Sequence, residues 1–137
     1  MRKNLNILLV EDDMIEIMKF NRTISKLACI HNIIEAKNGE EALEILYNIE
    51  TLPDFILLDL NMPKINGLEF LSIIRNNDYL KYIPTVILTL SNDHKDVSDC
   101  HQLGIACYLV KPLKFADYSE SIKTVLDYWC HNEFVQA

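Results

Sequence analysis

Glycine, proline and long apolar runs are scarce in this sequence. Only 3 of its 137 residues are glycine and 4 are proline, whereas 50% are hydrophobic and 24% are charged. This composition is typical of a globular protein and excludes a collagen-like or disordered chain. The apolar stretch behind the basic N-terminus is interrupted at Glu11, far short of the ~20 residues that a membrane span needs. We therefore expect a soluble, cytoplasmic protein without a membrane segment.

Basic clusters and metal-finger spacings are also absent from the sequence. Thirteen Lys and Arg against twenty Asp and Glu give a net charge of -7, and no basic run gathers into a patch that neutralises phosphates. We expect no direct binding to nucleic acid. The four cysteines form no Cys-x-x-Cys pair and the four histidines form no His-Glu-x-x-His motif. Reduced thiols and surface or packing histidines are therefore expected in place of a zinc site.

Short apolar runs rich in branched residues alternate with longer segments that have an apolar residue at every third or fourth position. The runs span residues 5–10, 33–34, 55–58, 85–88 and 108–110. Strands that are apolar on both faces and alternate with amphipathic helices indicate a parallel sheet covered on both sides. The sequence therefore predicts an α/β fold with a doubly wound (βα)₅ parallel sheet, in one domain over residues 1–137.

Polar side chains stand at the ends of four predicted strands: Glu11-Asp12-Asp13, Asp59, Thr89 and Lys111. In an open parallel sheet the carboxyl ends of the strands share one edge, where functional groups collect. Clustered carboxylates repel one another and need a metal or a lysine beside them, and an all-oxygen ligand set suits a hard cation such as Mg²⁺. A lysine and a threonine beside such a metal can bind the remaining oxygens of a phosphoryl group. The set predicts phosphoryl transfer to a carboxylate.

These motifs resemble those of the receiver domains of two-component response regulators, the family that includes the bacterial chemotaxis switch protein. The matching segments are residues 7–13, 58–63 with Gly67, 86–89 and 108–112, within a resemblance that covers about residues 5–131. The resemblance implies a flavodoxin-like sheet with strand order 2-1-3-4-5 and a stand-alone receiver with a core at about 5–131 and a short C-terminal tail. It also implies a phosphoprotein that is not an enzyme and catalyses only its own phosphorylation and dephosphorylation.

By this resemblance Asp59 is the phosphoacceptor. Asp12 and Asp59 supply carboxylate ligands to Mg²⁺, or to Mn²⁺ in its place. Asn61 supplies its backbone carbonyl to the metal, and Glu11 acts through a metal-bound water. Lys111 contacts the phosphoryl oxygens and pairs with Asp59 before phosphorylation.

The resemblance further implies a conformational switch. Thr89 swings its hydroxyl onto the phosphoryl group, and Tyr108 turns inward behind it. Pro112 holds the peptide bond that precedes it in the cis form, as family members do. The third acid, Asp13, has two interpretations: it is either part of the family pattern or the N-cap of the first helix.

Leu90 departs from the family pattern, because its position usually carries a small residue. It either lies over the approach to Asp59, where it hinders small phosphodonors and the inward path of Tyr108, or it packs into the sheet. Asn61 and Ser91 stand at the two positions that vary with the lifetime of the aspartyl phosphate in the family.

The expected donor is the phosphohistidine of a sensor histidine kinase or of a phosphotransfer protein. Because the length leaves no room for an effector domain, we expect output through a partner protein. The face made by the fourth helix, fifth strand and fifth helix is the candidate surface for the target and for a homodimer. The apolar stripe from Phe115 to Trp129 either belongs to this face or only packs on the sheet. Ile83-Pro84, residues 88–91 and the closing Trp129 are most similar to small regulators paired with bacterial phytochromes.

Three alternatives compete with this interpretation. An aspartate-nucleophile phosphohydrolase needs a second Asp two residues after the nucleophile as general acid, and that position holds Asn61. A flavodoxin-like nucleotide-binding module needs a glycine-rich phosphate loop, which three scattered glycines do not provide. The third alternative is a receiver that acts by constitutive protein contact, against which the intact set of acids, threonine and lysine argues.

Overall fold

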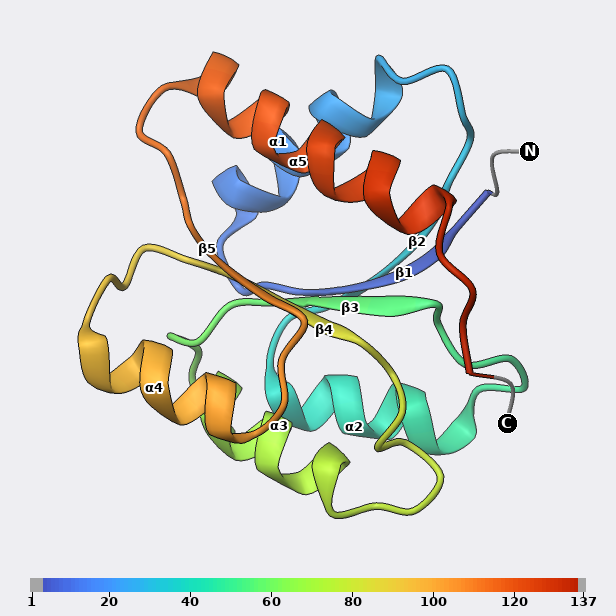
Figure 1. The fold of residues 1–137 in the computed structure, drawn as a ribbon, viewed down its shortest axis with the longest axis vertical. Helices are drawn as coiled ribbons and strands as arrows, with labels where there is room; N and C mark the ends of the chain where they lie inside the picture. The colour runs from blue at the N-terminus through green and yellow to red at the C-terminus, as the bar shows by residue number, and fades with distance from the viewer. Residues whose placement is uncertain (1–3, 136–137) are drawn as a thin grey trace.

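The computed structural model describes residues 4–135, in which five parallel strands alternate with five helices (Figure 1). The elements are β1 (Asn6–Val10), α1 (Met14–Ser25), β2 (Asn32–Ala36), α2 (Gly39–Asn48), β3 (Phe55–Leu58), α3 (Gly67–Arg75), β4 (Thr85–Thr89), α4 (His94–Gln102), β5 (Cys107–Val110) and α5 (Phe115–Cys130). The strand order is β2-β1-β3-β4-β5, with every neighbouring pair parallel. The predicted flavodoxin-like (βα)₅ sheet and its strand order are confirmed.

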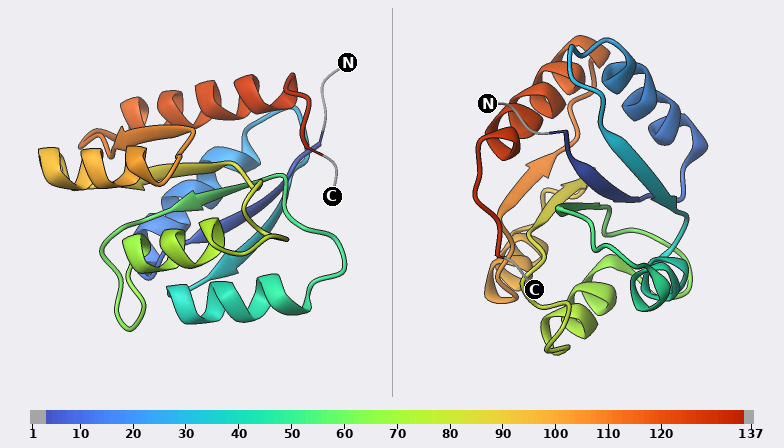
Figure 2. Two further views of the ribbon diagram at one scale, coloured as in Figure 1. Left: turned by 60° about the horizontal axis from the view of Figure 1, so that its bottom comes forward. Right: turned by 90° about the vertical axis from the view of Figure 1, so that its right-hand side faces the viewer.

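Helices cover both faces of the sheet. Figure 1 shows α1 and α5 above the sheet and α2, α3 and α4 below it, and the right-hand view of Figure 2 also places α1 and α5 on one side of the sheet. Side chains of β1 alternate between the two cores: Leu8 and Val10 pack toward α2 and α3, whereas Ile7 and Leu9 pack toward α1 and α5. Two apolar cores therefore hold the strands from both sides.

Four of the helices are capped at their N-termini by a side chain of the preceding loop. Asp13, Asn38, Asn66 and Asp93 are the N-caps of α1 to α4, and each side chain accepts a hydrogen bond from a backbone N–H of the first turn. For Asp13 the acceptor oxygen lies 2.9 Å from the nitrogen of Ile15. The N-cap interpretation of Asp13 is therefore confirmed, and the cap starts α1 two residues after the exposed Asp12.

The apolar stripe of α5 packs on the sheet. Its buried side chains belong to the core that α5 shares with α1 and the sheet: Tyr118, Ile122, Leu126 and Trp129. The ring of Trp129 stacks on Phe55 at 5.5 Å between centroids and on Phe134 at 5.7 Å. The first part of the expected C-terminal tail is thus anchored through Phe134, while residues 136–137 lie outside the described residues.

Among residues 4–135, no helix combines the length and the apolar character that crossing a membrane requires.

Candidate functional site

The parallel topology brings the four polar strand ends to one edge of the sheet. Glu11 follows β1, Asp59 follows β3, Thr89 ends β4, and Lys111 follows β5. Backbone hydrogen bonds continue past the strands and fix three of these residues. The N–H of Glu11 donates to the carbonyl of Ala36 at 2.9 Å. The N–H of Asp59 donates to the carbonyl of Val10 at 3.1 Å, and the N–H of Lys111 donates to the carbonyl of Thr89 at 2.7 Å.

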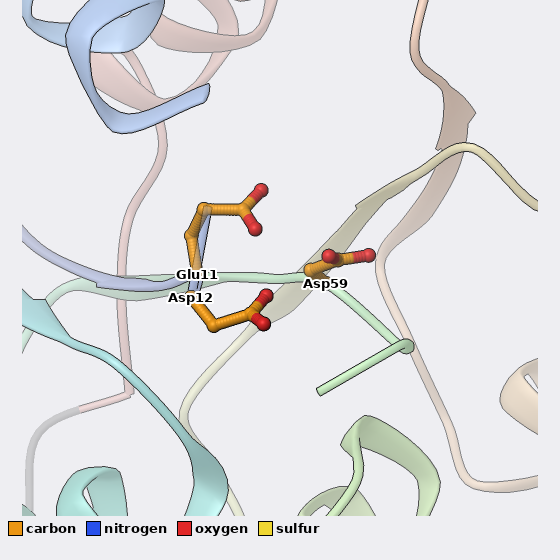
Figure 3. Close-up of side chains that lie close together, drawn as sticks. All are labelled: Glu11, Asp12 and Asp59. Atoms are coloured by element: carbon orange, nitrogen blue, oxygen red, sulfur yellow. The ribbon is translucent and has the colours of Figure 1, made fainter. Parts of the chain in front are cut away.

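Three carboxylates meet at this edge. One oxygen from each of Glu11, Asp12 and Asp59 lies within 4.8 Å of the others, and Figure 3 shows the three side chains converging. Glu11 and Asp59 are buried at 4% and 8% exposure, whereas Asp12 is exposed. A hollow of about 520 Å³ opens beside Asp12 and Asn61. Oxygen ligands that converge next to an open hollow fit a hard divalent cation, which could reach them from solvent.

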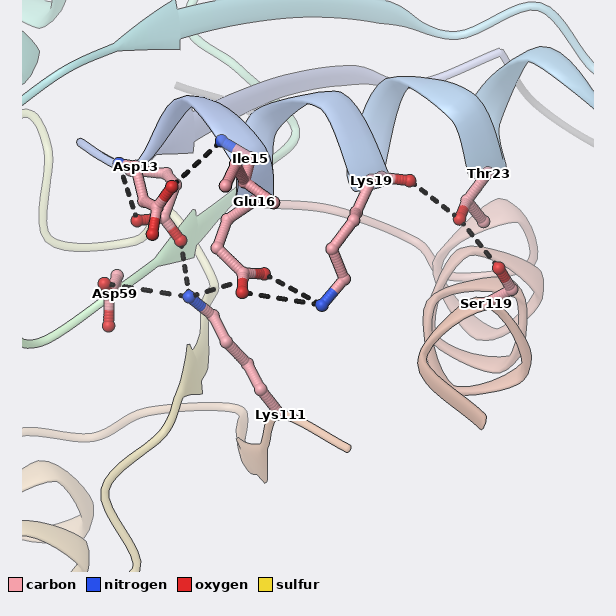
Figure 4. A network of polar contacts seen from close by, with 9 residues as sticks. Asp13, Ile15, Glu16, Lys19, Thr23, Asp59, Lys111 and Ser119 are labelled. Carbon is pink, nitrogen blue, oxygen red and sulfur yellow. Dashed lines mark hydrogen bonds and ion pairs between the residues drawn. The ribbon is translucent and has the colours of Figure 1, made fainter. Parts of the chain in front are cut away.

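Lys111 is the basic partner of this cluster. It is buried at 5% exposure, and its Nζ donates a hydrogen bond to Glu11 Oε1 at 2.6 Å. Nζ also lies 3.8 Å from Asp59 Oδ2 and 3.8 Å from Glu16 Oε2 (Figure 4). The expected Lys111–Asp59 pair is therefore a longer contact, and the short hydrogen bond goes to Glu11.

Burial and neighbouring charges shift the pKa values of both partners in this bond. Burial raises the pKa of Glu11 to about 7; the hydrogen bond from Lys111 opposes this rise, and the charge of Asp59 adds to it. For Lys111, burial acts to lower the pKa, but the hydrogen bond to Glu11 and the charges of Asp59, Glu11 and Glu16 raise it above its usual value. Lys111 therefore keeps its positive charge in the buried site.

Thr89 and Tyr108 are linked through Ser91. Thr89 is fully buried, and its hydroxyl accepts a hydrogen bond from the N–H of Ser91 at 3.4 Å. The half-buried Tyr108 donates its hydroxyl to the carbonyl of Ser91 at 2.9 Å. The Ser91 hydroxyl in turn donates to Asp96 Oδ2, on the first turn of α4, at 2.6 Å. One loop residue thus connects the end of β4 with β5 and α4.

One sequence-based expectation about this region is wrong, and one of the two alternatives for Leu90 is excluded. Residues 4–135 contain no cis peptide bond, so the bond before Pro112 is trans, the form that most X-Pro bonds adopt. Leu90 is 63% exposed, so it does not pack into the sheet. The exposed position is consistent with the turn that follows β4, where the chain leaves the sheet at Thr89.

Sequence reasoning missed two residues of this region, Glu16 and Asp96. Glu16 lies in the first turn of α1 and contacts Lys111, and Asp96 lies in the first turn of α4 and holds Ser91. Both are acidic residues near a helix N-terminus, where favourable interaction with the helix dipole is sufficient to account for an acid. The sequence therefore carries no signal that separates their contacts from this ordinary role.

Comparison with known proteins agrees with the geometry. The model of the family "Response regulator receiver domain" matches residues 7–123. Response regulator Rcp1 of Synechocystis sp. is 34% identical over 128 residues, which cover 90% of this chain and 87% of that protein. The probable methanogenesis regulatory protein FilR2 of Methanothrix harundinacea is 35% identical over 127 residues, which cover 90% of this chain and 82% of that protein.

Two solved structures are similar over nearly the whole chain. The phosphorylated cyanobacterial phytochrome response regulator RcpA has a TM-score of 0.90 and 28% identity, with 98% of this chain and 100% of that chain covered. The Mn²⁺-bound form of Rcp1 has a TM-score of 0.86 and 32% identity, with 96% of this chain and 98% of that chain covered. Sheet, site and comparisons lead to one conclusion: this chain belongs to the response regulator receiver domain family.

Proposed function

We propose that this receiver is a switch that accepts a phosphoryl group on Asp59 from the phosphohistidine of a histidine kinase or a phosphotransfer protein, in a reaction that depends on Mg²⁺. The observation that carries the proposal is the edge at which three carboxylates lie within 4.8 Å of one another and the buried Lys111 approaches two of them. Asp12, Asp59 and the Asn61 carbonyl would hold the cation, with Glu11 acting through a bound water. Mn²⁺ is the alternative cation.

In this reaction Asp59 is the nucleophile, and its main requirement is correct positioning. A carboxylate oxygen of Asp59 bonds to phosphorus, and the bond between phosphorus and the donor imidazole nitrogen breaks, with its electron pair leaving on the imidazole. Phosphoryl transfer has a loose transition state, so positioning and charge neutralisation supply most of the catalysis. When bound, the cation would supply positive charge for the phosphoryl oxygens. Lys111 would supply the second positive charge, because its Nζ lies 3.8 Å from Asp59 Oδ2.

The signal leaves the site through the loop after β4. A phosphoryl group brings up to two negative charges at neutral pH, and a donor such as the Thr89 hydroxyl stabilises them. Ser91 then moves with Thr89, since its N–H donates to the Thr89 hydroxyl. Its carbonyl accepts the hydroxyl of Tyr108, so a shift of this loop changes the position of Tyr108 on the surface of β5.

A phosphotransfer assay tests the assignment of Asp59. The unaltered protein and Asp59→Asn are incubated with a phosphorylated histidine kinase, and acid-labile phosphate is counted. Asp54→Asn is the matched control, because Asp54 precedes the same strand at its opposite end, where it binds the N–H of Asn6 at 2.7 Å. We expect labelling of the unaltered protein and of Asp54→Asn only. Equal labelling of Asp59→Asn would contradict the assignment, and no labelling of any sample would favour a receiver that acts by constitutive contact.

A titration with Mg²⁺ and with Mn²⁺ tests the cation site. We expect saturable binding without phosphorylation, because clustered carboxylates need a counter-charge. Asp12→Ala should abolish it. Asp13→Asn is the control, since Asp13 is an exposed N-cap and Asn caps a helix equally well. Binding that is unchanged in Asp12→Ala would show that the cation is held elsewhere.

As the phosphoryl donor we propose a sensor histidine kinase of the bacteriophytochrome type. RcpA is a phytochrome response regulator, and the bacteriophytochrome response regulator AtBRR is 29% identical with a TM-score of 0.76. Exposed apolar side chains next to the site could contact a protein donor: Met14, Ile15 and Met18 at the start of α1, and Leu113 just after Lys111. Phosphotransfer profiling against every histidine kinase of the source organism tests this choice. Faster transfer from a kinase of another type would contradict it.

The proposed output surface, for a target protein and for a homodimer, includes α4, β5 and α5. β5 is one of the two edge strands of the sheet, and a hollow of about 730 Å³ lies between it and α5. Its lining includes Leu109 and Val125, with Glu120 also present. Light scattering at several concentrations tests the homodimer. We expect self-association that Val125→Glu abolishes; a monomer at every concentration would leave only a target protein for this surface.

A further inference from the structure

Glu16 is a third carboxylate within reach of Lys111, beyond the acids that the family motifs identify. Its Oε2 lies 3.8 Å from Lys111 Nζ, in a side chain that is only 15% exposed. Within residues 4–135 this oxygen is buried and takes part in no hydrogen bond. Figure 4 shows the carboxylate on the side of Lys111 away from Asp59. A buried acceptor with unused capacity therefore stands next to the charge that the site depends on.

Lys111 and a divalent cation compete for the same acids. The hydrogen bond of Lys111 goes to Glu11, and its second contact is Asp59, both of which belong to the carboxylate trio at the sheet edge. When a cation binds to this trio, Lys111 has to give up part of its interactions with Glu11 and Asp59. Glu16 does not belong to the trio. Its Oε2 takes part in no hydrogen bond, although Lys19 Nζ lies 3.4 Å away, and it can therefore accept one from the ammonium of Lys111 at that moment. Without such an acceptor, a buried ammonium that leaves Glu11 would lose its charge partner, which is costly.

On the basis of the proposed cation and phosphoryl site, we propose that Glu16 is a positioning residue that draws Lys111 away from Glu11 and Asp59 and so leaves both acids available to the divalent cation. Lys19 sets the strength of this attraction. Its Nζ lies 3.4 Å from both oxygens of Glu16, one turn further along α1. It neutralises part of the Glu16 charge, so loss of the Lys19 charge strengthens the attraction of Glu16 for Lys111.

Removal of the Glu16 charge and removal of the Lys19 charge should therefore change the affinity for Mg²⁺ in opposite directions. Glu16→Gln keeps the shape of the side chain and removes its charge, so Lys111 remains on the metal-binding acids. We expect the affinity for Mg²⁺ to fall roughly five- to tenfold. Lys19→Gln leaves Glu16 with its full charge, and the affinity should rise roughly threefold. Asp13→Asn is the control for a general field effect, because this exposed charge stands next to Asp12 yet is screened by solvent; it should change the affinity by less than about twofold.

The experiment measures Mg²⁺ dissociation constants by calorimetry, with the melting temperature of each variant to show that it is folded. A double-mutant cycle separates positioning from a merely structural role: in a Lys111→Gln background, Glu16→Gln should change the affinity by less than about twofold. The same loss in both backgrounds, or a change of the same sign for Glu16→Gln and Lys19→Gln, would overturn the role of Glu16. If Glu16→Gln does not fold, the sign of the Lys19→Gln effect decides.

The two proposals fail in different ways. If the unaltered protein binds Mg²⁺ and is labelled on Asp59, but Glu16→Gln has unchanged affinity, only the role of Glu16 is refuted. If the unaltered protein neither binds Mg²⁺ nor is labelled on Asp59, both the proposed function and the role of Glu16 are refuted.

Discussion

Replacement of Leu90 by alanine tests whether a bulky residue beside the site controls access to Asp59. Leu90 follows the last residue of β4, the fully buried Thr89, and is itself 63% exposed. Alanine removes three carbons at this point. If Leu90 covers the approach, the change admits both small phosphodonors and the water that hydrolyses the aspartyl phosphate.

The structure sets the expected cost in stability. Full burial of a leucine side chain contributes about 1.5–3 kcal/mol. Because 63% of Leu90 is exposed, its truncation should lower the free energy of unfolding by roughly a third of that, ~0.5–1 kcal/mol. For a domain of this size the melting temperature should then fall by only about 2–4 °C. Leu88, two residues earlier on β4 and 5% exposed, is the matched core control, and Leu88→Ala should cost about 2–5 kcal/mol.

The assay compares three rates on one preparation of each variant: labelling by acetyl phosphate, transfer from the kinase, and loss of phosphate. For Leu90→Ala we expect the rate of labelling by acetyl phosphate and the rate of phosphate loss to rise by about threefold or more. This corresponds to an activation barrier lowered by ~0.7 kcal/mol. Transfer from the kinase should change by less than about twofold, since protein contacts position that donor. A loss of stability as large as that of Leu88→Ala, or unchanged acetyl phosphate and hydrolysis rates, would refute the role of Leu90 in access.

Three further substitutions test how the site is held in place. In Gly67→Ala the new Cβ would lie 2.5 Å from the backbone oxygen of Asp59, so α3 has to shift; we expect a loss of about 1–3 kcal/mol in urea unfolding and slower labelling by acetyl phosphate. Arg75 donates to main-chain carbonyls of the loops before β4 and after α4, and Arg75→Ala should cost about 2–4 kcal/mol in the same unfolding assay, with only partial recovery in Arg75→Lys. Tyr108→Phe removes the 2.9 Å hydrogen bond to Ser91 and should cost about 1 kcal/mol, whereas unchanged stability would show that this bond does not hold the resting loop.

The fold and the convergence of the site residues could be predicted because both follow from a parallel sheet. Once the five apolar runs are strands of one such sheet, their carboxyl ends must share an edge. Glu11, Asp59 and Lys111 are then neighbours without any knowledge of side-chain conformation. Helix caps such as Asp13 are also local, since one side chain and one nearby N–H decide them.

The partners of individual side chains could not be predicted in the same way. The long, flexible side chain of Lys111 brings its Nζ within 4 Å of three carboxylates, and packing decides that Glu11 receives the 2.6 Å bond. The same limit applies to Leu90, whose exposure depends on where the chain leaves the sheet. The trans bond before Pro112 depends on a free-energy difference of only about 0.5–1 kcal/mol, which a motif does not determine.

Identification of the residue that carries the phosphate tests the central claim most directly. The protein is labelled by its kinase with Mg²⁺ present or chelated, the acyl phosphate is trapped by borohydride reduction, and the modified peptide is sequenced by mass spectrometry. We predict reduction at Asp59 alone, and only when Mg²⁺ is present during labelling. Modification of a different residue, or equal modification of Asp59 after chelation of every divalent cation, would contradict the claim that this edge of the sheet is a cation-dependent phosphoacceptor site.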